Sequence, residues 1–296
     1  MIHHHNPQPR SPRRVVVLGA TGFVAADLVG HLGDLGVEAL PLPGSQYDLR
    51  DPGAVASLRE LVRPDDALVF VSALTPDRGR DIRTLMANLA MGENVCAALE
   101  QAPCAQVVYI SSDAVYADDC NPVRETSCCD PSSNHGLMHL VRERMLGQTL
   151  KKAKVPLLVL RPSLLFGVHD THNGYGPNRF ARTALAEKKI TLFGEGEERR
   201  DHVAVKDLSR LAGLGLLHRS EGVLNVATGD STSFGDVARL VAASVGEGVE
   251  VVGTPRQNPV THRHFDITET LRAFPTFAYT PLSEALGEFV RAAAGD

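Results

Sequence analysis

Two groups of residues in this chain have the types and the spacing that chemistry needs. The first lies in VVVLGATGFVA (15–25), where Gly19, Gly22 and Ala25 follow one another at intervals of three. Glycine at the first two positions lets the backbone turn tightly and removes the Cβ atoms that would keep a pyrophosphate from the main chain. A helix beginning near residue 23 would direct its N-terminal N–H groups toward that pyrophosphate. The segment therefore predicts a dinucleotide site.

The second group is a pair of histidines, His135 and His139, one helical turn apart in HGLMH. Side chains four residues apart share a helix face, and an imidazole with an ordinary pKa of about 6.5 can exchange protons near neutral pH. The same spacing suits two zinc ligands. No Glu follows His135 as in the zincin motif, and a third ligand could come from His169, His172 or His202 only through the fold. A helix cap followed by a structural histidine explains the pair equally simply, and we assign no metal.

The elements that would position these residues alternate along the chain. Strands are expected at 15–18, 37–41, 67–72, 106–111, 156–161 and 223–226, and helices at about 22–32, 53–62, 81–101, 134–152 and 207–218. Alternation of this kind predicts an α/β fold, a Rossmann-type doubly wound parallel sheet. Beyond Gly229 the pattern changes to a helix (234–246), a short strand (249–252) and a last helix (282–294), which predicts a smaller C-terminal substrate-binding lobe.

These patterns divide the chain into three parts. Residues 1–14 are expected to be a disordered tail, and residues 15–167 with 201–228 to form the dinucleotide-binding domain. Residues 168–200 with 229–296 are expected to form the substrate-binding lobe. The substrate would then lie in the crevice between the lobes, outside the carboxyl ends of the strands.

Composition limits the partners. The formal net charge is −5, and no run of Lys and Arg is dense enough to follow a nucleic-acid backbone. No apolar stretch approaches the length of a membrane span, and residues 1–14 lack the apolar core of a signal peptide. The five cysteines follow no metal-knuckle spacing. We therefore expect a cytoplasmic protein with no nucleic-acid or membrane partner.

Five segments in a fixed order extend the pattern beyond the glycine turn. They are GATGFVA (19–25), DLRD (48–51), YISSDAVYAD (109–118), LRPSLLFG (160–167) and LFGEGEERRDHVAVKDL (192–208). Together they resemble the extended short-chain dehydrogenase/reductases, the NAD(P)-dependent nucleotide-sugar epimerases, dehydratases and reductases. The resemblance covers nearly all of the chain after residue 14. It implies NAD or NADP as cofactor, a nucleotide sugar as the small-molecule substrate, and a homodimer formed through helices 81–101 and 134–152.

The resemblance also implies which residues hold the cofactor. They are Gly19, Thr21, Gly22, Phe23 and Val24 at the pyrophosphate, Asp48 and Leu49 at the adenine, Val71, Ser72 and Ala73 along the cofactor, and His139 at the nicotinamide ribose. Asp48 could instead be a turn or capping acid ahead of Pro52. The stretch EALPLPGS (38–45) has no acid at the strand end to repel a 2′-phosphate, and no arginine is evident there. The choice between NAD and NADP therefore stays open.

On the substrate side, the resemblance points first to Arg200 in FGEGEERRD. Its planar guanidinium would pair with the diphosphate of a nucleotide sugar, although a salt bridge to Asp201 or Asp207 is the structural alternative. The further candidates for substrate contact are Asn88, Ser112, Asp113, Asn178 and Arg179.

The chain departs from this family at the catalytic residues. The family reaction uses a Ser or Thr, and then a Tyr and a Lys one helical turn apart. Ser112 fits the first position, but His135 stands in the Tyr position and His139 in the Lys position. Either His135 transfers the proton while His139 binds the ribose, or the redox machinery is lost or repurposed, or the pair holds a metal. On the same helix, Arg142 and Glu143 are expected on a solvated face.

Overall fold

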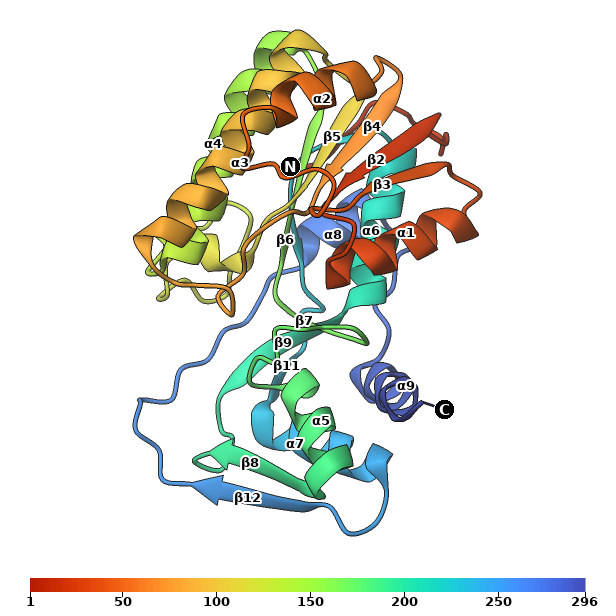
Figure 1. Ribbon diagram of the computed structural model, residues 1–296. Coiled ribbons are helices and arrows are strands. Elements are labelled where there is room, and N and C mark those ends of the chain that lie inside the picture. The colour runs from red at the N-terminus through yellow and green to blue at the C-terminus, as the bar shows by residue number, and fades with distance from the viewer. Residues whose placement is uncertain (296) are drawn as a thin grey trace.

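A computed structural model describes residues 1–295 as a larger lobe around a central sheet and a smaller lobe below it (Figure 1). The described sheet has seven strands in the order β1-β10-β6-β5-β4-β2-β3. Its parallel strands are β2 (Arg14–Leu18), β3 (Ala39–Leu42), β4 (Asp66–Phe70), β5 (Gln106–Ile110), β6 (Leu157–Pro162) and β10 (Ser220–Val226). This is the doubly wound arrangement that the alternating pattern predicts.

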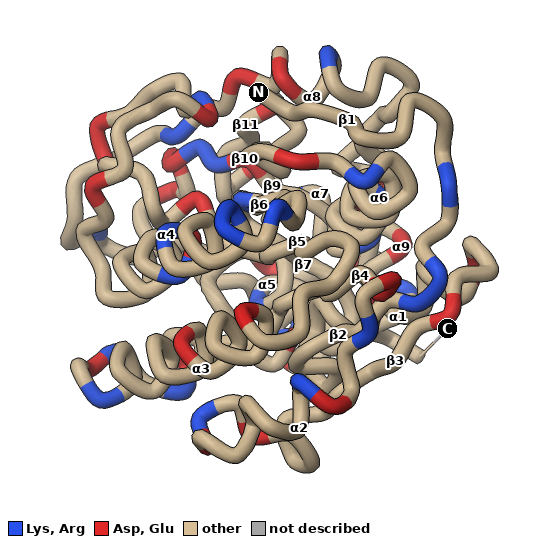
Figure 2. Tube along the Cα trace, turned by 90° about the horizontal axis from the view of Figure 1, so that it is seen from above, with Lys and Arg blue, Asp and Glu red and all other residues tan. Residues whose placement is uncertain are grey.

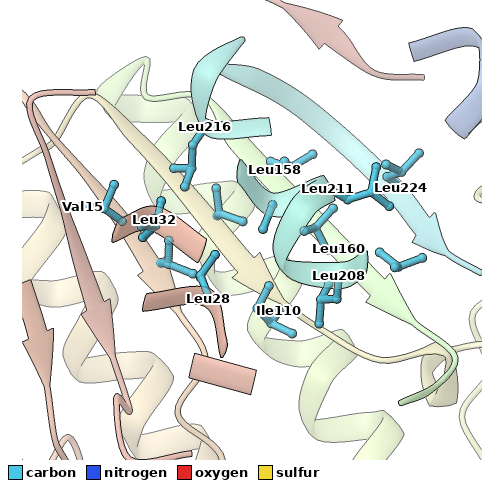
Figure 3. Close-up of a cluster of buried hydrophobic side chains, with 14 of the residues drawn as sticks. Val15, Leu28, Leu32, Ile110, Leu158, Leu160, Leu208, Leu211, Leu216 and Leu224 are labelled. Carbon is cyan, nitrogen blue, oxygen red and sulfur yellow. The ribbon is translucent and has the colours of Figure 1, made fainter. Parts of the chain in front are cut away.

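Helices cover both faces of the sheet (Figure 1). α1 (Phe23–Asp34) and α6 (Val205–Leu217) pack on one face, and α2 (Ala54–Leu61), α3 (Ile82–Gln101) and α4 (Asn134–Ala153) on the other. The strands are continuous apolar runs because both of their faces are buried. Figure 3 shows the cluster beneath α1 and α6, where Leu28, Leu32, Leu208 and Leu211 meet apolar strand residues.

The smaller lobe has its own core. It contains the three-stranded sheet of β7 (Leu164–Phe166), β9 (Arg199–Ala204) and β11 (Ser231–Ser233), and the pair β8 (Lys189–Phe193) and β12 (Glu250–Thr254). The helices α5 (Pro177–Glu187), α7 (Phe234–Val245) and α9 (Leu282–Ala294) pack around buried Phe166, Phe180, Phe234 and Phe289.

The prediction of a disordered N-terminal tail is wrong for its first residues. His3–His4 form β1, which pairs antiparallel with Ser220 and Glu221 at the edge of β10. Ile2 is buried in the larger core, and Nδ1 of His4 lies 2.8 Å from Oγ of Ser220. Further hydrogen bonds from Asn6 and Arg10 to the end of α6 hold the segment in place, and its polar composition gives no sign of them.

The expected boundary of the smaller lobe also needs correction. Residues 229–296 do not all belong to it, because α8 (Thr268–Ala273) contacts β10, and Phe274 and Phe277 lie in the core of the larger lobe. The chain therefore returns to the central sheet before α9. Two phenylalanines three residues apart supply the apolar surface that brings it back.

Charged residues of both signs are interspersed along the trace in Figure 2. Within residues 1–295, the structure contains no helix with the length and apolar character required to cross a membrane.

Candidate active site

A cavity of about 900 Å³ lies where β2, β4, β5 and β6 end. It brings together most of the residues that the sequence singled out: Gly19, Thr21, Gly22, Phe23, Val24, Asp48, Leu49, Val71, Ser72, Ala73, Ser112, Asp113, His135, His139 and Asn178. The volume is in the range of small-molecule and cofactor sites, and its position at the carboxyl ends of the strands is where α/β sheets bind ligands.

The glycine turn has the geometry that a dinucleotide needs. Gly19 has φ +88°, and a Cβ atom there would lie 2.5 Å from Oγ of Ser72 and 2.9 Å from its backbone. Among the described residues no side chain caps α1 at Gly22, and the first turn contains no acid. The first N–H groups of the helix are therefore left for an anion, so these residues fit a pyrophosphate.

At the other end of the cavity, Asp48 is paired within its own turn. Its carboxylate accepts from the backbone N–H of Arg50 at 2.9 Å, and Oδ2 lies 2.6 Å from Nη2 of the same residue. These contacts with Arg50 lower the pKa of Asp48. The turn-acid interpretation of Asp48 thus describes its local structure, although the carboxylate still lines the cavity. The sequence showed no arginine at the strand end in residues 38–45, but Arg50, a few residues later, also lines the cavity.

The two histidines occupy the first turns of α4. Ser133 caps this helix, since its Oγ accepts from the N–H of Gly136 at 3.1 Å. The rings of His135 and His139 lie edge to face with their centroids 4.6 Å apart. His139 is buried, and its Nδ1 lies 2.7 Å from the hydroxyl of Tyr109 on β5.

Burial decides the charge of both imidazoles. It lowers the pKa of His135 to about 4, and the nearby His172 and Arg142 contribute in the same direction. Burial, with His135 and Arg142, holds the pKa of His139 well below its usual value. Both rings are therefore neutral at pH 7. The sequence-based expectation of an imidazole that titrates near neutrality does not hold for His135.

Arg142 is buried beneath the cavity, and the expectation of a solvated face is wrong. Its Nε and Nη2 donate to the carbonyl oxygen of Asn88 at 2.9 and 2.6 Å, and Nη1 donates to that of Ser72 at 2.7 Å. Arg142 stands seven residues after His135 and three after His139, so the helical period places all three on one face. The guanidinium thereby joins α4 to α3 and to the loop after β4.

Glu143 is buried as well. It makes an ion pair with Arg161 of β6, with Nη2 and Oε2 2.6 Å apart, and accepts from Oγ of Ser111 at 2.6 Å. A buried carboxylate with a bidentate arginine and a hydroxyl donor fixes geometry well. These contacts set the position of α4, and hence of His135, relative to the strand ends.

Ser112 lies in the cavity wall at the start of a short 3₁₀ helix (Asp113–Val115). Its Oγ accepts from the N–H of Ala114 at 3.1 Å, and its hydroxyl donates to Oδ1 of Asp113 over 3.5 Å. Burial raises the pKa of Asp113, while Arg263, 3.4 Å away, acts in the opposite direction.

Three predicted substrate residues lie outside the lining of this cavity. Asn88 makes two hydrogen bonds with the backbone of Leu74, from Nδ2 at 3.0 Å and to Oδ1 at 2.8 Å, and so anchors the loop after β4. Arg200 donates to the carbonyl oxygen of Thr261 at 2.7 Å, with Glu198 3.9 Å away. Arg179 is exposed on α5. The roles of these three in substrate binding stay predictions.

The sequence reasoning missed Tyr109 and Arg142. A signal existed for each: Tyr109 is the one hydroxyl-bearing residue in the apolar strand QVVYI, and Arg142 shares the helical face of the histidines. No cluster of three or more His, Cys, Asp or Glu that could hold a metal occurs within residues 1–295.

The parallel sheet, the glycine turn and the cavity at the strand ends define a Rossmann-type nucleotide-binding protein. The pattern of the NAD dependent epimerase/dehydratase family matches residues 15–227, so the chain belongs to this family. The family and the fold indicated by the five sequence segments are thus confirmed.

Individual relatives agree with this placement. The chain is 28% identical over 173 residues to dTDP-L-rhamnose 4-epimerase from Burkholderia thailandensis, covering 53% of this chain and 45% of that protein. It spans about half the length of the curated relatives it matches. A GDP-L-fucose synthetase from Naegleria fowleri superposes with a TM-score of 0.87 at 19% identity, covering 97% of this chain and 95% of the other.

A UDP-N-acetylglucosamine 4-epimerase from Methanobrevibacter ruminantium, solved in complex with UDP-N-acetylmuramic acid, superposes with a TM-score of 0.84 at 20% identity. The alignment covers 97% of this chain and 99% of that one. At such identities the likeness shows the fold.

Proposed function

We propose that this protein binds NAD or NADP and transfers hydride to or from a carbon of a nucleotide sugar, as an epimerase, dehydratase or reductase. The observation that carries the proposal is a single cavity lined both by the glycine turn and by Ser112, His135 and His139. The family to which the chain belongs, and relatives described as acting on nucleotide sugars, support it.

The cofactor would be held by the glycine turn and the uncapped start of α1, with Asp48 and Leu49 at the adenosine end. A bound nicotinamide dinucleotide supplies a reversible hydride acceptor. The chain itself supplies Ser112 as a hydrogen-bond donor to the sugar oxygen, and neutral His135 at the position where relatives place an acid/base group. His139 faces the same cavity and would bind a ribose hydroxyl.

The proposal is tested by binding and turnover measured separately. Calorimetric titration with NADH and NADPH measures affinity. With UDP-glucose and dTDP-glucose as probes, absorbance at 340 nm measures net hydride transfer, and proton resonance of the sugar detects an epimerised or dehydrated product, which forms without net change of the cofactor. We expect micromolar binding of one dinucleotide and slow but measurable reduction of the oxidised form. Gly19→Ala is expected to weaken both, whereas Gly33→Ala, in the helix that follows this turn and with no atom within 4 Å of the added Cβ, leaves both intact.

One observation favours a second function, binding of a dinucleotide or nucleotide sugar without redox turnover. His135 and His139 replace the Tyr and Lys of the family pattern, and both rings are neutral at pH 7 because burial lowers their pKa. Tight dinucleotide binding with no absorbance change and no new sugar product for any probe, in wild type and in His135→Ala alike, would establish this alternative in place of the first.

We also propose a homodimer formed through α3 and α4, which lie side by side (Figure 1). Ile82 and Met86, one turn apart on α3, are 63% and 58% exposed, and Leu137 on α4 is 40% exposed. Apolar side chains that protrude from a helix face are suited to a two-fold interface. Light scattering after gel filtration measures the mass directly.

A further inference from the structure

Asp77 and His172 form a pair that joins the two lobes. Asp77 lies in the loop after β4, and His172 in the segment between β7 and α5. Nδ1 of His172 is 2.9 Å from Oδ1 of Asp77, and the backbone N–H of His172 donates to the side chain of buried Asp170 at 3.0 Å. A carboxylate that holds Nδ1 fixes the ring and leaves Nε2 free, which is how imidazoles are oriented for proton transfer.

His172 stands beside the residue in the Tyr position. It lines the 900 Å³ cavity and also an adjoining cavity of about 450 Å³ near the N-terminal ends of α3 and α4. His135 lines both cavities as well. The free edge of His172 is therefore placed where a sugar bound between the lobes would meet Ser112 and His135.

The charges around His172 suit a proton-transfer group. Although partial burial opposes it, hydrogen bonds from Thr75 and His172 lower the pKa of Asp77, so this carboxylate is ionised at neutral pH. Its neighbour Arg78 lies 3.6 Å from the same carboxylate, and Arg80 lines both cavities. The other titratable groups near His172 are Asp170, which accepts from its backbone N–H, and neutral His135. An ionised carboxylate stabilises the imidazolium that forms when Nε2 takes up a proton.

We propose that His172, oriented by Asp77, exchanges the proton of the substrate hydroxyl, and that His135 acts beside it as a neutral hydrogen-bonding partner. This inference rests on the proposed function. In the oxidative direction the substrate O–H bond breaks and its proton passes to Nε2 of His172. The hydride on the same carbon leaves to an oxidised nicotinamide dinucleotide, so the carbon loses two electrons and a C=O bond forms. The reverse step returns both to the substrate.

Kinetics provide the first test, with UDP-glucose and dTDP-glucose as probes. His172→Gln is expected to lower kcat by about 10²- to 10⁴-fold, with an unchanged dissociation constant for NADH. Asp77→Asn keeps a hydrogen-bond acceptor but removes the charge that stabilises the imidazolium, so kcat should fall while the dissociation constant for NADH stays unchanged. His169→Gln is the matched control, because His169 is an exposed histidine on the same segment.

Nuclear magnetic resonance of ¹⁵N-histidine-labelled protein gives a readout that needs no turnover. We expect the His172 ring to carry its proton on Nδ1 in the free protein, and to lose this tautomer preference in Asp77→Ala while the ring of His169 is unaffected. A proton on Nε2 in wild type, or the same tautomer preference in Asp77→Ala, would overturn the assignment of Asp77 as the orienting residue.

The two proposals fail in different ways. If wild type transfers hydride and His172→Gln does so at the same kcat, the proposed function stands and the role of His172 is refuted. If wild type binds dinucleotide but transfers no hydride to any probe, the proposed function fails, and the role of His172 fails with it. Loss of kcat in His172→Gln but not in His169→Gln supports both.

Discussion

The hydroxyl of Tyr109 lies 2.7 Å from Nδ1 of His139, and both side chains are buried at the end of β5. Burial raises the pKa of Tyr109 far above its usual value, so the phenol keeps its proton, and we infer that it donates this proton to Nδ1 of His139. His139 must then carry its own proton on Nε2. The residue in the Lys position thus presents a single, fixed N–H donor in place of an ammonium group.

Replacement of this phenol tests the arrangement. Tyr109→Phe should lower the free energy of unfolding by about 1–3 kcal/mol, because Nδ1 of His139 is left buried without a donor. It should also allow the His139 ring to change tautomer, which ¹⁵N resonance detects. Tyr116→Phe is the control, since it removes another buried phenol hydrogen bond, to Asn225 at 2.6 Å, away from His139. A His139 ring that keeps its Nε2 proton in Tyr109→Phe contradicts the role of Tyr109.

The glycine turn gives a second prediction. Gly19→Ala forces a Cβ into a residue with φ +88° and within 2.9 Å of the backbone of Ser72. We expect a loss of about 1–3 kcal/mol in unfolding free energy from the strained backbone, together with weaker NADH binding. Chemical denaturation and calorimetry measure the two effects. Gly33→Ala, within α1, should instead be neutral or stabilise the protein by about 0.5–1 kcal/mol.

The pH dependence of stability follows from His135. Its pKa is about 4 in the folded protein, against about 6.5 for an ordinary imidazole, so the unfolded chain binds more protons between these values. Stability is therefore fully present above about pH 6.5 and declines as the pH falls toward 4. The shift corresponds to at most about 3 kcal/mol. His139 and His202, whose pKa values burial also lowers, contribute in the same sense.

Comparison with a variant isolates the contribution of His135. Urea unfolding of wild type and His135→Asn between pH 4.5 and 7.5 should give curves that converge as the pH falls, because the variant lacks one of the groups that must be protonated. His169→Asn should parallel wild type throughout. Parallel curves for His135→Asn would show that His135 is not buried in its neutral form.

Much of the fold could be predicted because apolar runs and alternation are local signals. The strands at 15–18, 106–111 and 156–161 and the helices at 81–101 and 134–152 agree with the structure within one or two residues. The helix Pro177–Glu187 and the strand Lys189–Phe193 were missed. Both belong to the smaller lobe, where the elements are short and their periodicity gives a weak signal.

The residues of the site also divide into those that local sequence predicts and those that only the fold brings together. The residues of the glycine turn are contiguous in sequence and were found together, whereas Asp77 and His172 are 95 residues apart and meet only through the fold. Arg142 was misplaced because a charged residue is normally solvated. Here backbone carbonyl groups of Ser72 and Asn88 replace the water. Contacts between a side chain and a distant main chain leave no trace in local composition.

A substitution in the proposed homodimer interface should change the mass of the protein in solution. Met86→Glu places a carboxylate in the apolar surface of α3, where burial in an interface would leave it unpaired. We expect light scattering to report a dimer for wild type and a monomer for the variant at micromolar concentration. Leu271→Glu, an equally exposed apolar residue on α8 of the larger lobe, should leave the mass unchanged. A wild-type monomer would remove the proposed interface.

Arg142 gives the last prediction, since its buried guanidinium is one of the causes that lower the pKa of His135. Arg142→Gln removes this cation, so the titration midpoint of the His135 ring should rise. The variant should also lose about 1–3 kcal/mol of unfolding free energy, because the carbonyl groups of Ser72 and Asn88 lose donors. Arg144→Gln, on the exposed side of the same helix, is the control and should change neither quantity. If the His135 midpoint is the same in wild type and Arg142→Gln, burial alone accounts for the neutral imidazole and the charge beneath the cavity has no part in it.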